Sequence, residues 1–325
     1  MMDRLPALQN LADRHQLSDA DAKRLNELAR RDVEPQGLQT TIPLGLALIG
    51  AALVGLGIIF WIAANWASLS RAGHFALLQA VIVVMCVGAL FRPAARPALS
   101  LLALLGIGGL FAYFGQTYQT GADPWQLFAL WAALALPLCL GVRHDALWTP
   151  WALVGMTAIA LWIYAHVGRD WRVGGEDLFY HLAGWSAALL LVFALSPGGR
   201  RFTGAGTWGM RVAVTLATCL ITWTGFFALF GSSVAPQFVL GLVLLSGAAA
   251  ALCMPRLHET FALSAIALAL NVMLVGGMVR ILLDGAGNDP IFLTILIGLI
   301  AAGLLAVTVK IVVSVARRHA QEYPV

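Results

Sequence analysis

Two long apolar runs are separated by the polar, glycine-punctuated stretch Gly115-Gln116-Thr117-Tyr118-Gln119-Thr120-Gly121-Ala122-Asp123-Pro124-Trp125. Asp is favoured at the N-cap of a helix, and proline is favoured at the first helical position. Asp123 and Pro124 therefore predict a helix start, with Gln126 placed to reach back to the cap. The stretch predicts a turn that connects one apolar helix to the next.

The chain is far more apolar than a soluble domain of its length. Its 325 residues are 60% hydrophobic and 11% charged, and the mean hydropathy is +0.83. Lipid cannot satisfy backbone polar groups, so long apolar runs in a bilayer form helices, whereas a barrel would show alternating apolar and polar residues. The composition predicts an all-α, polytopic membrane helix bundle.

The apolar runs predict about ten transmembrane helices within residues 40–325, because about 20 apolar residues are needed to cross the hydrocarbon core. The runs cover residues 43–65, 75–92, 98–114, 124–142, 147–167, 178–196, 208–230, 236–254, 259–282 and 290–312.

Residues 1–39 predict a small cytoplasmic helical hairpin. Leu5, Leu8 and Leu11 share one helical face, and Ser18 is placed to cap a second helix. The hairpin is too short to hold a catalytic core of its own. Its leucine face could pack on the membrane domain or bind a protein partner.

Basic residues predict the orientation in the membrane. With ten helices, all of the 20 Lys and Arg residues except Arg71, Arg169, Arg172 and Arg280 lie on the side of the N-terminus. Basic loops stay in the cytoplasm, so both termini are expected there. The 115–123 turn is then outside.

Polar and aromatic side chains near the outer helix ends form the candidate site. They offer several hydrogen-bond donors and acceptors within a short stretch, and they are Asn65, Trp66, Gln116, Tyr118, Gln119, Asp123 and Trp125. Two interpretations stay open: these residues bind a ligand, or they cap helices and satisfy one another. Most of the aromatic residues at this level fit an interfacial belt.

The cysteines and histidines give only weak indications of metal binding or catalysis. Cys86, Cys139, Cys219 and Cys253 lie in apolar runs at unrelated spacings, which favours packing over metal binding or disulfides. His166 and His181 flank an outer connection with Asp177, where a metal site is conceivable but less favoured than ordinary interfacial histidines. We expect no cofactor, no metal, no nucleic-acid partner and no enzymatic activity, since no catalytic constellation is visible.

The leader with its Leu-rich hairpin and three further segments carry a family resemblance over residues 1–145, and weaker similarity extends beyond. The three segments are Ile58-Ile59-Phe60-Trp61-Ile62-Ala63-Ala64-Asn65-Trp66, Gly115-Gln116-Thr117-Tyr118-Gln119, and Asp123-Pro124-Trp125-Gln126-Leu127-Phe128 followed by Trp131-Ala132. The chain thereby resembles the bacterial predicted membrane proteins of the domain of unknown function DUF 2157. The resemblance implies the membrane architecture and draws attention to Asn65, Trp66 and the turn; it implies no substrate.

These observations favour small-solute transport or ligand sensing through an outward-facing polar pocket, with the ligand unidentified. The alternative is a non-catalytic envelope scaffold or assembly partner that uses the N-terminal hairpin. A membrane enzyme acting on lipid-linked substrates is disfavoured, because no carboxylate pair, metal set or activated nucleophile is evident.

The predicted orientation can be tested by cysteine labelling at Ala122. After the native cysteines are replaced, a cysteine at this position should react with a membrane-impermeant maleimide added from outside, because the turn lies opposite the basic loops. Labelling solely from the cytoplasmic side would contradict the orientation.

Overall fold

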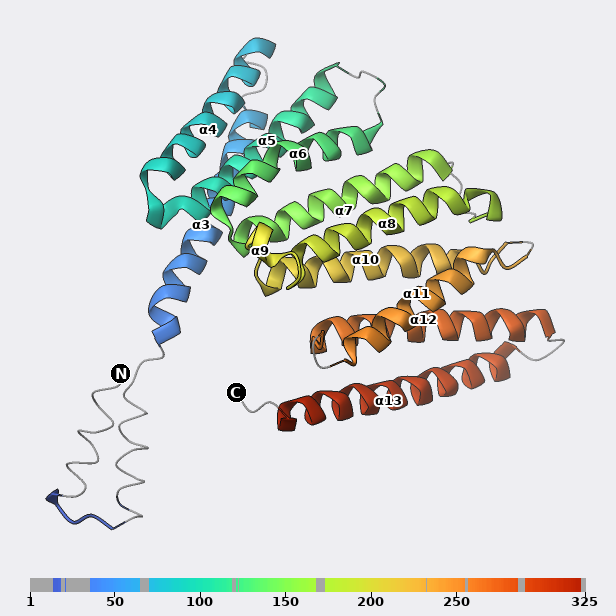
Figure 1. Ribbon diagram of the computed structural model, residues 1–325. Helices are drawn as coiled ribbons and strands as arrows, with labels where there is room; N and C mark the ends of the chain where they lie inside the picture. Colours follow the sequence, from blue (N-terminus) through green and yellow to red (C-terminus); the bar gives the residue numbers. More distant parts are fainter. Residues whose placement is uncertain are drawn as a thin grey trace. The chain divides into compact units, whose positions relative to one another are not determined.

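The computed structural model of the chain describes residues 14–18, 21, 36–64, 70–118, 121, 123–167, 173–231, 233–254, 257–285 and 290–322 (Figure 1). The chain divides into two compact units, Met1–Val54 and Gly55–Val325. Each unit is considered by itself below.

A described helix lies in each of the ten predicted apolar runs, and no strand occurs in the described ranges. The all-α membrane architecture is therefore confirmed. The helices are α3 (Gln36–Ala64), α4 (Arg71–Phe91), α5 (Arg96–Tyr118), α6 (Pro124–Val142), α7 (Asp145–Val167), α8 (Leu178–Leu195), α10 (Thr207–Phe227), α11 (Pro236–Leu252), α12 (Thr260–Gly285) and α13 (Pro290–Glu322). Short helices are η1 (Pro93–Ala95), η2 (Gly175–Asp177) and α9 (Arg200–Thr203).

Helix length and composition support multiple membrane crossings. Eight described helices are long and apolar enough to cross a bilayer, and Gly45–Ile58 and Pro236–Leu252 are shorter apolar helices. The protein is thus a multi-pass membrane protein in a lipid bilayer. Two predicted ends differ clearly from the structure: α5 continues to Tyr118 instead of ending at 114, and α13 continues to Glu322.

Only part of the predicted hairpin lies within the described residues of the first unit. At its second helix start, the Ser18 hydroxyl donates to the Asp21 carboxylate at 2.7 Å and accepts the Asp21 backbone N–H at 3.3 Å. The predicted cap at Ser18 is therefore present. Leu5, Leu8 and Leu11 lie outside the described residues, and the 1–39 hairpin boundary stays a prediction.

In the second unit, helices pack mainly on their neighbours in sequence. Helix α7 contacts α5, α6, α8 and α10, and α10 in turn contacts α11 and α12. Figure 1 shows α7, α8 and α10 side by side. Helix α13 packs on α12, where the Thr308 hydroxyl donates to the Asn271 side chain at 3.2 Å.

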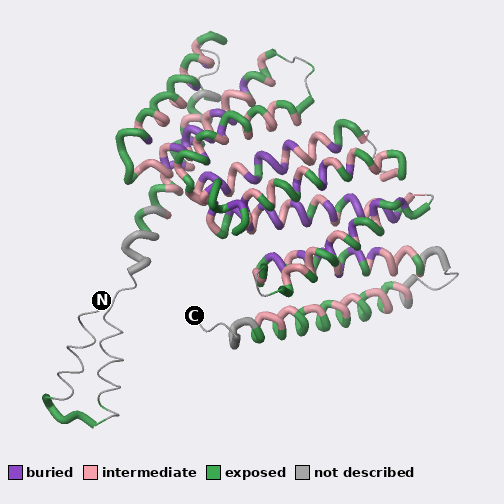
Figure 2. The backbone as a smooth tube through the Cα atoms, viewed as in Figure 1, coloured by how far each residue is buried: buried purple, intermediate pink, exposed green. Residues whose placement is uncertain are grey.

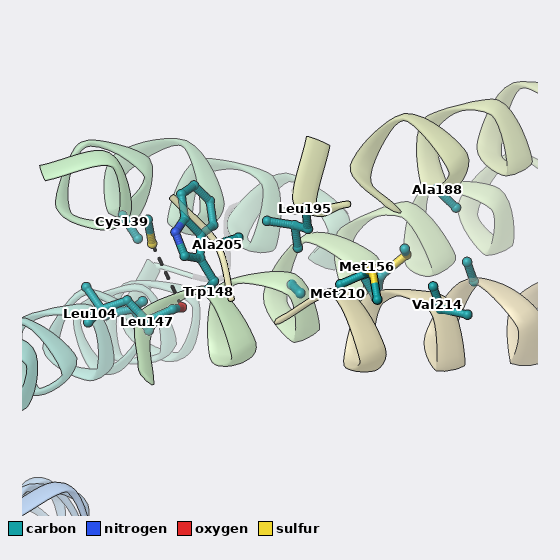
Figure 3. Packing of buried hydrophobic residues seen from close by; sticks show 14 of the residues in the cluster. Leu104, Cys139, Leu147, Trp148, Met156, Ala188, Leu195, Ala205, Met210 and Val214 are labelled. Atoms are coloured by element: carbon teal, nitrogen blue, oxygen red, sulfur yellow. Dashed lines mark hydrogen bonds between the residues drawn. The ribbon is translucent and has the colours of Figure 1, made fainter. Parts of the chain in front are cut away.

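The core around α7 combines small residues with a few large side chains (Figure 3). Ala152, Ala188 and Ala213 are fully buried, and Trp148 is 1% exposed among them. Large apolar residues face outward instead, such as Phe91 at 77% and Phe179 at 72% exposure. This distribution suits a bilayer, because small residues let helices approach closely while lipid solvates the large ones. Figure 2 shows the difference in burial between α7, which carries many buried residues, and α13, whose apolar window Leu293–Arg318 has none.

A carboxylate at the start of α7 caps a different helix. Asp145 accepts the backbone N–H groups of Gly206 at 2.6 Å, Trp208 at 2.9 Å and Gly209 at 3.3 Å, which are otherwise free donors at the start of α10. Arg143 donates to the Arg201 and Phe202 carbonyls at 2.8 and 2.9 Å. The α6–α7 connection thereby holds the segment that leads into α10.

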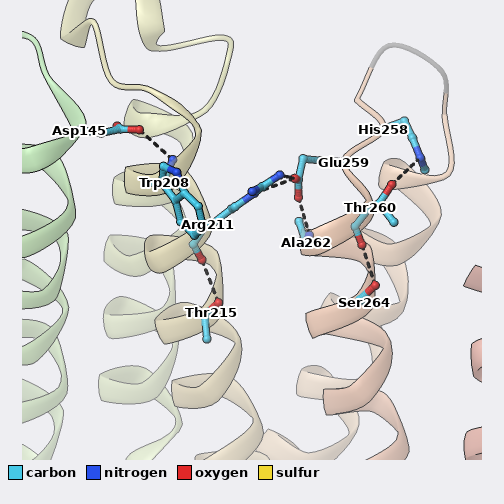
Figure 4. A network of polar contacts seen from close by, with 9 residues as sticks. All are labelled: Asp145, Trp208, Arg211, Thr215, His258, Glu259, Thr260, Ala262 and Ser264. Atoms are coloured by element: carbon cyan, nitrogen blue, oxygen red, sulfur yellow. Dashed lines mark hydrogen bonds and ion pairs between the residues drawn. The ribbon is translucent and has the colours of Figure 1, made fainter. Parts of the chain in front are cut away.

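One ion pair joins α10 to the start of α12 at the same end (Figure 4). Arg211 donates to Glu259 at 2.9 Å, and Glu259 also accepts the backbone N–H of Ala262. The guanidinium lies over the rings of Trp208 and Phe261, at 5.4 and 5.3 Å. Glu259 is therefore both an N-cap and a link between two helices.

Asp145→Ala should lower the melting temperature in detergent, because three backbone donors at the start of α10 lose their acceptor. The loss of an N-cap costs about 0.5–2 kcal/mol, and Asp145→Asn should cost less because an acceptor oxygen remains. Asp123→Ala is the matched control, since the exposed Asp123 at the N-cap of α6 makes no side-chain capping bond. Equal losses in the two alanine variants would contradict the role of Asp145.

Candidate functional site

The predicted turn is shorter than its sequence suggests. Helix α5 includes Gly115, Gln116 and Tyr118, so the connection to α6 begins at residue 119. A Cβ added at Gly115 would lie 3.1 Å from the Leu127 side chain of α6, which shows how closely the two helices approach there. Gly121 has φ +69°, a left-handed conformation that glycine adopts without strain.

Asp123 occupies the predicted N-cap position, but its predicted side-chain cap is wrong. Its backbone is extended, with φ −63° and ψ 139°, and Pro124 follows at the first helical position. The N–H of Gln126 donates to the Asp123 backbone carbonyl at 3.0 Å. The carboxylate forms no capping bond and remains exposed.

The structure distributes the candidate residues over different surroundings. Gln116, Tyr118 and Asp123 are exposed, and Trp125 is half-buried. The remaining candidates, Asn65, Trp66 and Gln119, lie outside the described residues.

Tyr118 belongs to a ring cluster between the start of α4 and the end of α5, which we call the α4–α5 cluster. It comprises His74, Phe75, Tyr113, Phe114 and Tyr118. The Tyr118 ring lies 5.0 Å from that of Phe114 and 5.9 Å from that of Phe75. Tyr113 and His74 are buried beneath, with 3.3 Å between the hydroxyl and Nδ1. The cluster joins the two helices, and Tyr118 forms its exposed edge.

Trp125 belongs to a second cluster, the Trp125 cluster, built from Trp125, Trp162, His166 and Tyr180. These residues come from α6, α7 and α8. The His166 ring lies 6.3 Å from Trp125, 4.7 Å from Trp162 and 5.4 Å from Tyr180. His166 Nδ1 is 2.8 Å from the Trp162 carbonyl, so Nδ1 carries a proton and, in the neutral ring, Nε2 is an acceptor.

The Trp125 indole nitrogen is unusual among the tryptophans of the described helices. It is buried and has no hydrogen-bond partner within the described part of the chain. By contrast, Trp131 donates to the Leu104 carbonyl at 2.9 Å, and Trp151 donates to the Ala132 carbonyl at 2.8 Å. A buried donor without an acceptor is costly, so this N–H is suited to an acceptor that the described residues do not supply.

His166 and His181 have different partners and do not form a common site. His181 is buried, with Nδ1 3.0 Å from the Asp177 carbonyl, while the exposed His166 stacks in the Trp125 cluster. Among the described residues, no three His, Cys, Asp or Glu side chains are grouped as metal ligands would be. The arrangement offers ring faces, neutral donors and the exposed carboxylate of Asp123.

Sequence reasoning located Trp125 but missed its partners. The aromatic residues were expected to form an interfacial belt, and His166 was considered only beside His181. The four-residue spacing of Trp162 and His166, which places both on one helical face, was the available signal. Contact with Trp125 depends on how α6 and α7 pack, which spacing does not specify.

Fold and site together define a polytopic helical membrane protein with aromatic clusters where its helices meet the connecting turns. Residues 9–148 match the model of a family described as "Predicted membrane protein (DUF2157)". This match confirms the resemblance, and it includes Asn65, Trp66 and the entire 115–125 stretch. Neither the curated proteins nor the solved structures gave a match.

Trp125→Phe should leave the melting temperature nearly unchanged, because it keeps a ring while removing a donor that has no described acceptor. Trp131→Phe is the matched control, since it removes a donor that is bonded to Leu104. That loss should cost about 0.5–1.5 kcal/mol. Comparing both variants with wild type in the same detergent checks the difference, and a larger loss for Trp125→Phe would contradict it.

Proposed function

We propose that the protein is a non-enzymatic receptor that senses a small solute at its outer face, in the inner membrane of a bacterium with both termini cytoplasmic. The Trp125 cluster is the binding element. The observation that carries the proposal is the buried indole N–H of Trp125, which has no acceptor among the described residues. A bound solute would supply that acceptor.

The chemistry of the cluster favours a small zwitterionic or cationic solute. Ring faces attract cations, most strongly when the ring is that of tryptophan. Trp125 and Trp162 supply such faces, and the exposed carboxylate of Asp123 lies two residues before Trp125. A carboxylate or hydroxyl on the same solute would accept the indole hydrogen bond.

The residue types in the apolar runs favour sensing over transport. Ion-coupled transporters commonly keep an ionisable residue deep in a membrane helix, and no such residue is evident here. The polar side chains of Asn271 and Thr308 in α12 and α13 are engaged with each other or with their own helix.

A scaffold function is the second candidate, and α13 favours it. The apolar window Leu293–Arg318 has no buried residue, so most of this helix is available to lipid or to another membrane helix. In this role the N-terminal hairpin would bind a cytoplasmic protein partner.

Glycine betaine and choline are suitable probes for the receptor. Either solute should raise the melting temperature of the wild-type protein in detergent, because a ligand that binds only the folded state stabilises it. The shift should disappear in Trp125→Phe, whose own melting temperature is expected to stay near wild type. Trp151→Phe is the control: its indole hydrogen bond lies elsewhere, so the solute-induced shift should remain.

Two outcomes would count against the proposal. If neither solute shifts the melting temperature, this ligand class is wrong. If the shift persists in Trp125→Phe, binding occurs elsewhere. Uptake of the same solute into proteoliposomes would favour transport over sensing.

A further inference from the structure

A lateral groove lies between α10 and α12, on a part of the membrane domain that the proposed receptor site does not use. It has a volume of about 460 Å³, within the range typical of small-molecule sites. Its walls are formed by Thr215, Thr218, Cys219, Thr222, Trp223, Phe226 and Phe227 of α10, and by Ala265, Leu268, Ala269 and Val272 of α12.

Small side chains form the floor of this groove, and larger ones form its lips. Thr218 and Ala269 are 7% and 6% exposed. Trp223, Leu268 and Val272 are 54%, 56% and 43% exposed. The groove is therefore open sideways, from the surface of a membrane-crossing helix pair, in the direction from which lipid approaches.

The lining is largely apolar, because two of its three threonine hydroxyls are bonded within α10. Thr215 donates to the Arg211 carbonyl at 2.9 Å, and Thr222 donates to the Thr218 carbonyl at 2.7 Å, both within α10. Arg211, one turn before Thr215, is paired with Glu259 outside the groove. An occupant would thus meet methyl, methylene and ring surfaces along its length.

The dimensions favour a single lipid chain over a membrane helix. The α10 wall extends from Thr215 to Phe227, the last residue of the helix, which is about 18 Å at the helical rise. That length is close to one leaflet of the hydrocarbon core, about 15 Å. A partner helix would cross both leaflets and is about 10 Å wide, so it would match the groove over only part of its length.

We propose that this groove is a binding site for one acyl chain of a membrane phospholipid, in the leaflet where α10 ends. The headgroup stays at the interface beside Trp223 and Phe227, because most of the groove lining consists of methyl, methylene and ring surfaces. Binding depends on dispersion contacts with the floor, which an empty groove would lose. The chain fills a hollow that the small residues Thr218 and Ala269 leave between the two helices.

Native mass spectrometry of protein purified from palmitoyl-oleoyl-phosphatidylcholine nanodiscs tests the proposal. The wild type should retain one phospholipid under activation that removes the others. Val272→Trp, which fills the groove from its lip, should lose that lipid. Leu274→Trp is the matched control on the same helix, since Leu274 is similarly exposed at 46% but does not line the groove. This variant should retain the lipid.

Retention of the lipid by Val272→Trp as strongly as by wild type would overturn the proposal. If Val272→Trp does not fold, a second measurement on the wild type tests the same proposal. The emission of Trp223 is obtained by subtracting the fluorescence of Trp223→Phe from that of the wild type. Phosphatidylcholine with brominated acyl chains should quench this emission, and the quenching should saturate at a low mole fraction of the brominated lipid. Quenching in proportion to the mole fraction would mean ordinary lipid contact.

The exposed thiol of Cys219 distinguishes a protein partner from a lipid. In a Cys253→Ser background, Cys219 is the one exposed cysteine of the three that remain. Oxidation in nanodiscs should leave the protein monomeric if a lipid chain fills the groove. Efficient Cys219–Cys219 dimer formation would show that a second copy occupies it and would overturn the lipid assignment.

Discussion

The constraint on which the structure depends is that polar groups inside a bilayer must find partners within the protein. Helices satisfy the backbone, and indole N–H groups in the described helices find acceptors on other segments. Trp131 donates to Leu104, Trp148 to Thr203 and Trp151 to Ala132. Each bond joins two different segments, so satisfying the donor also fixes how neighbouring helices pack. Trp125 stands out against this pattern, and for that reason its cluster is the best candidate for binding.

The same environment explains the distribution of side-chain size. Since lipid solvates large apolar residues as well as the protein interior does, helix contacts in a membrane rely on close approach rather than on hydrophobic burial. Fully buried alanines line α7, α8 and α10, while residues such as Phe91 and Phe179 face outward. Between α10 and α12, the small residues Thr218 and Ala269 line a groove that the bilayer can fill.

Polar contacts at the helix ends complete the architecture. Asp145 caps α10 from the start of α7, and Glu259 both caps α12 and pairs with Arg211. In the sequence, Asp145 and Glu259 are ordinary loop residues near apolar runs, and neither was singled out. Asp123 had the clearest capping signature and forms no side-chain cap. A side chain can cap a helix that begins about 60 residues later only if the two loops meet in the fold. A local sequence motif carries no information on which loops meet.

The sequence by itself determined the membrane class, the positions of the apolar helices and the start of α6, because composition, run length and the Asp-Pro pair act locally. It also identified Trp125 and the 115–125 stretch as the notable polar region. The tertiary structure alone decided that Tyr118 and Trp125 belong to separate ring clusters, that His166 joins Trp125, and that a groove opens between α10 and α12. These features arise from contacts between helices, and the contacts depend on which faces pack together, which the spacing of residues along one helix does not specify.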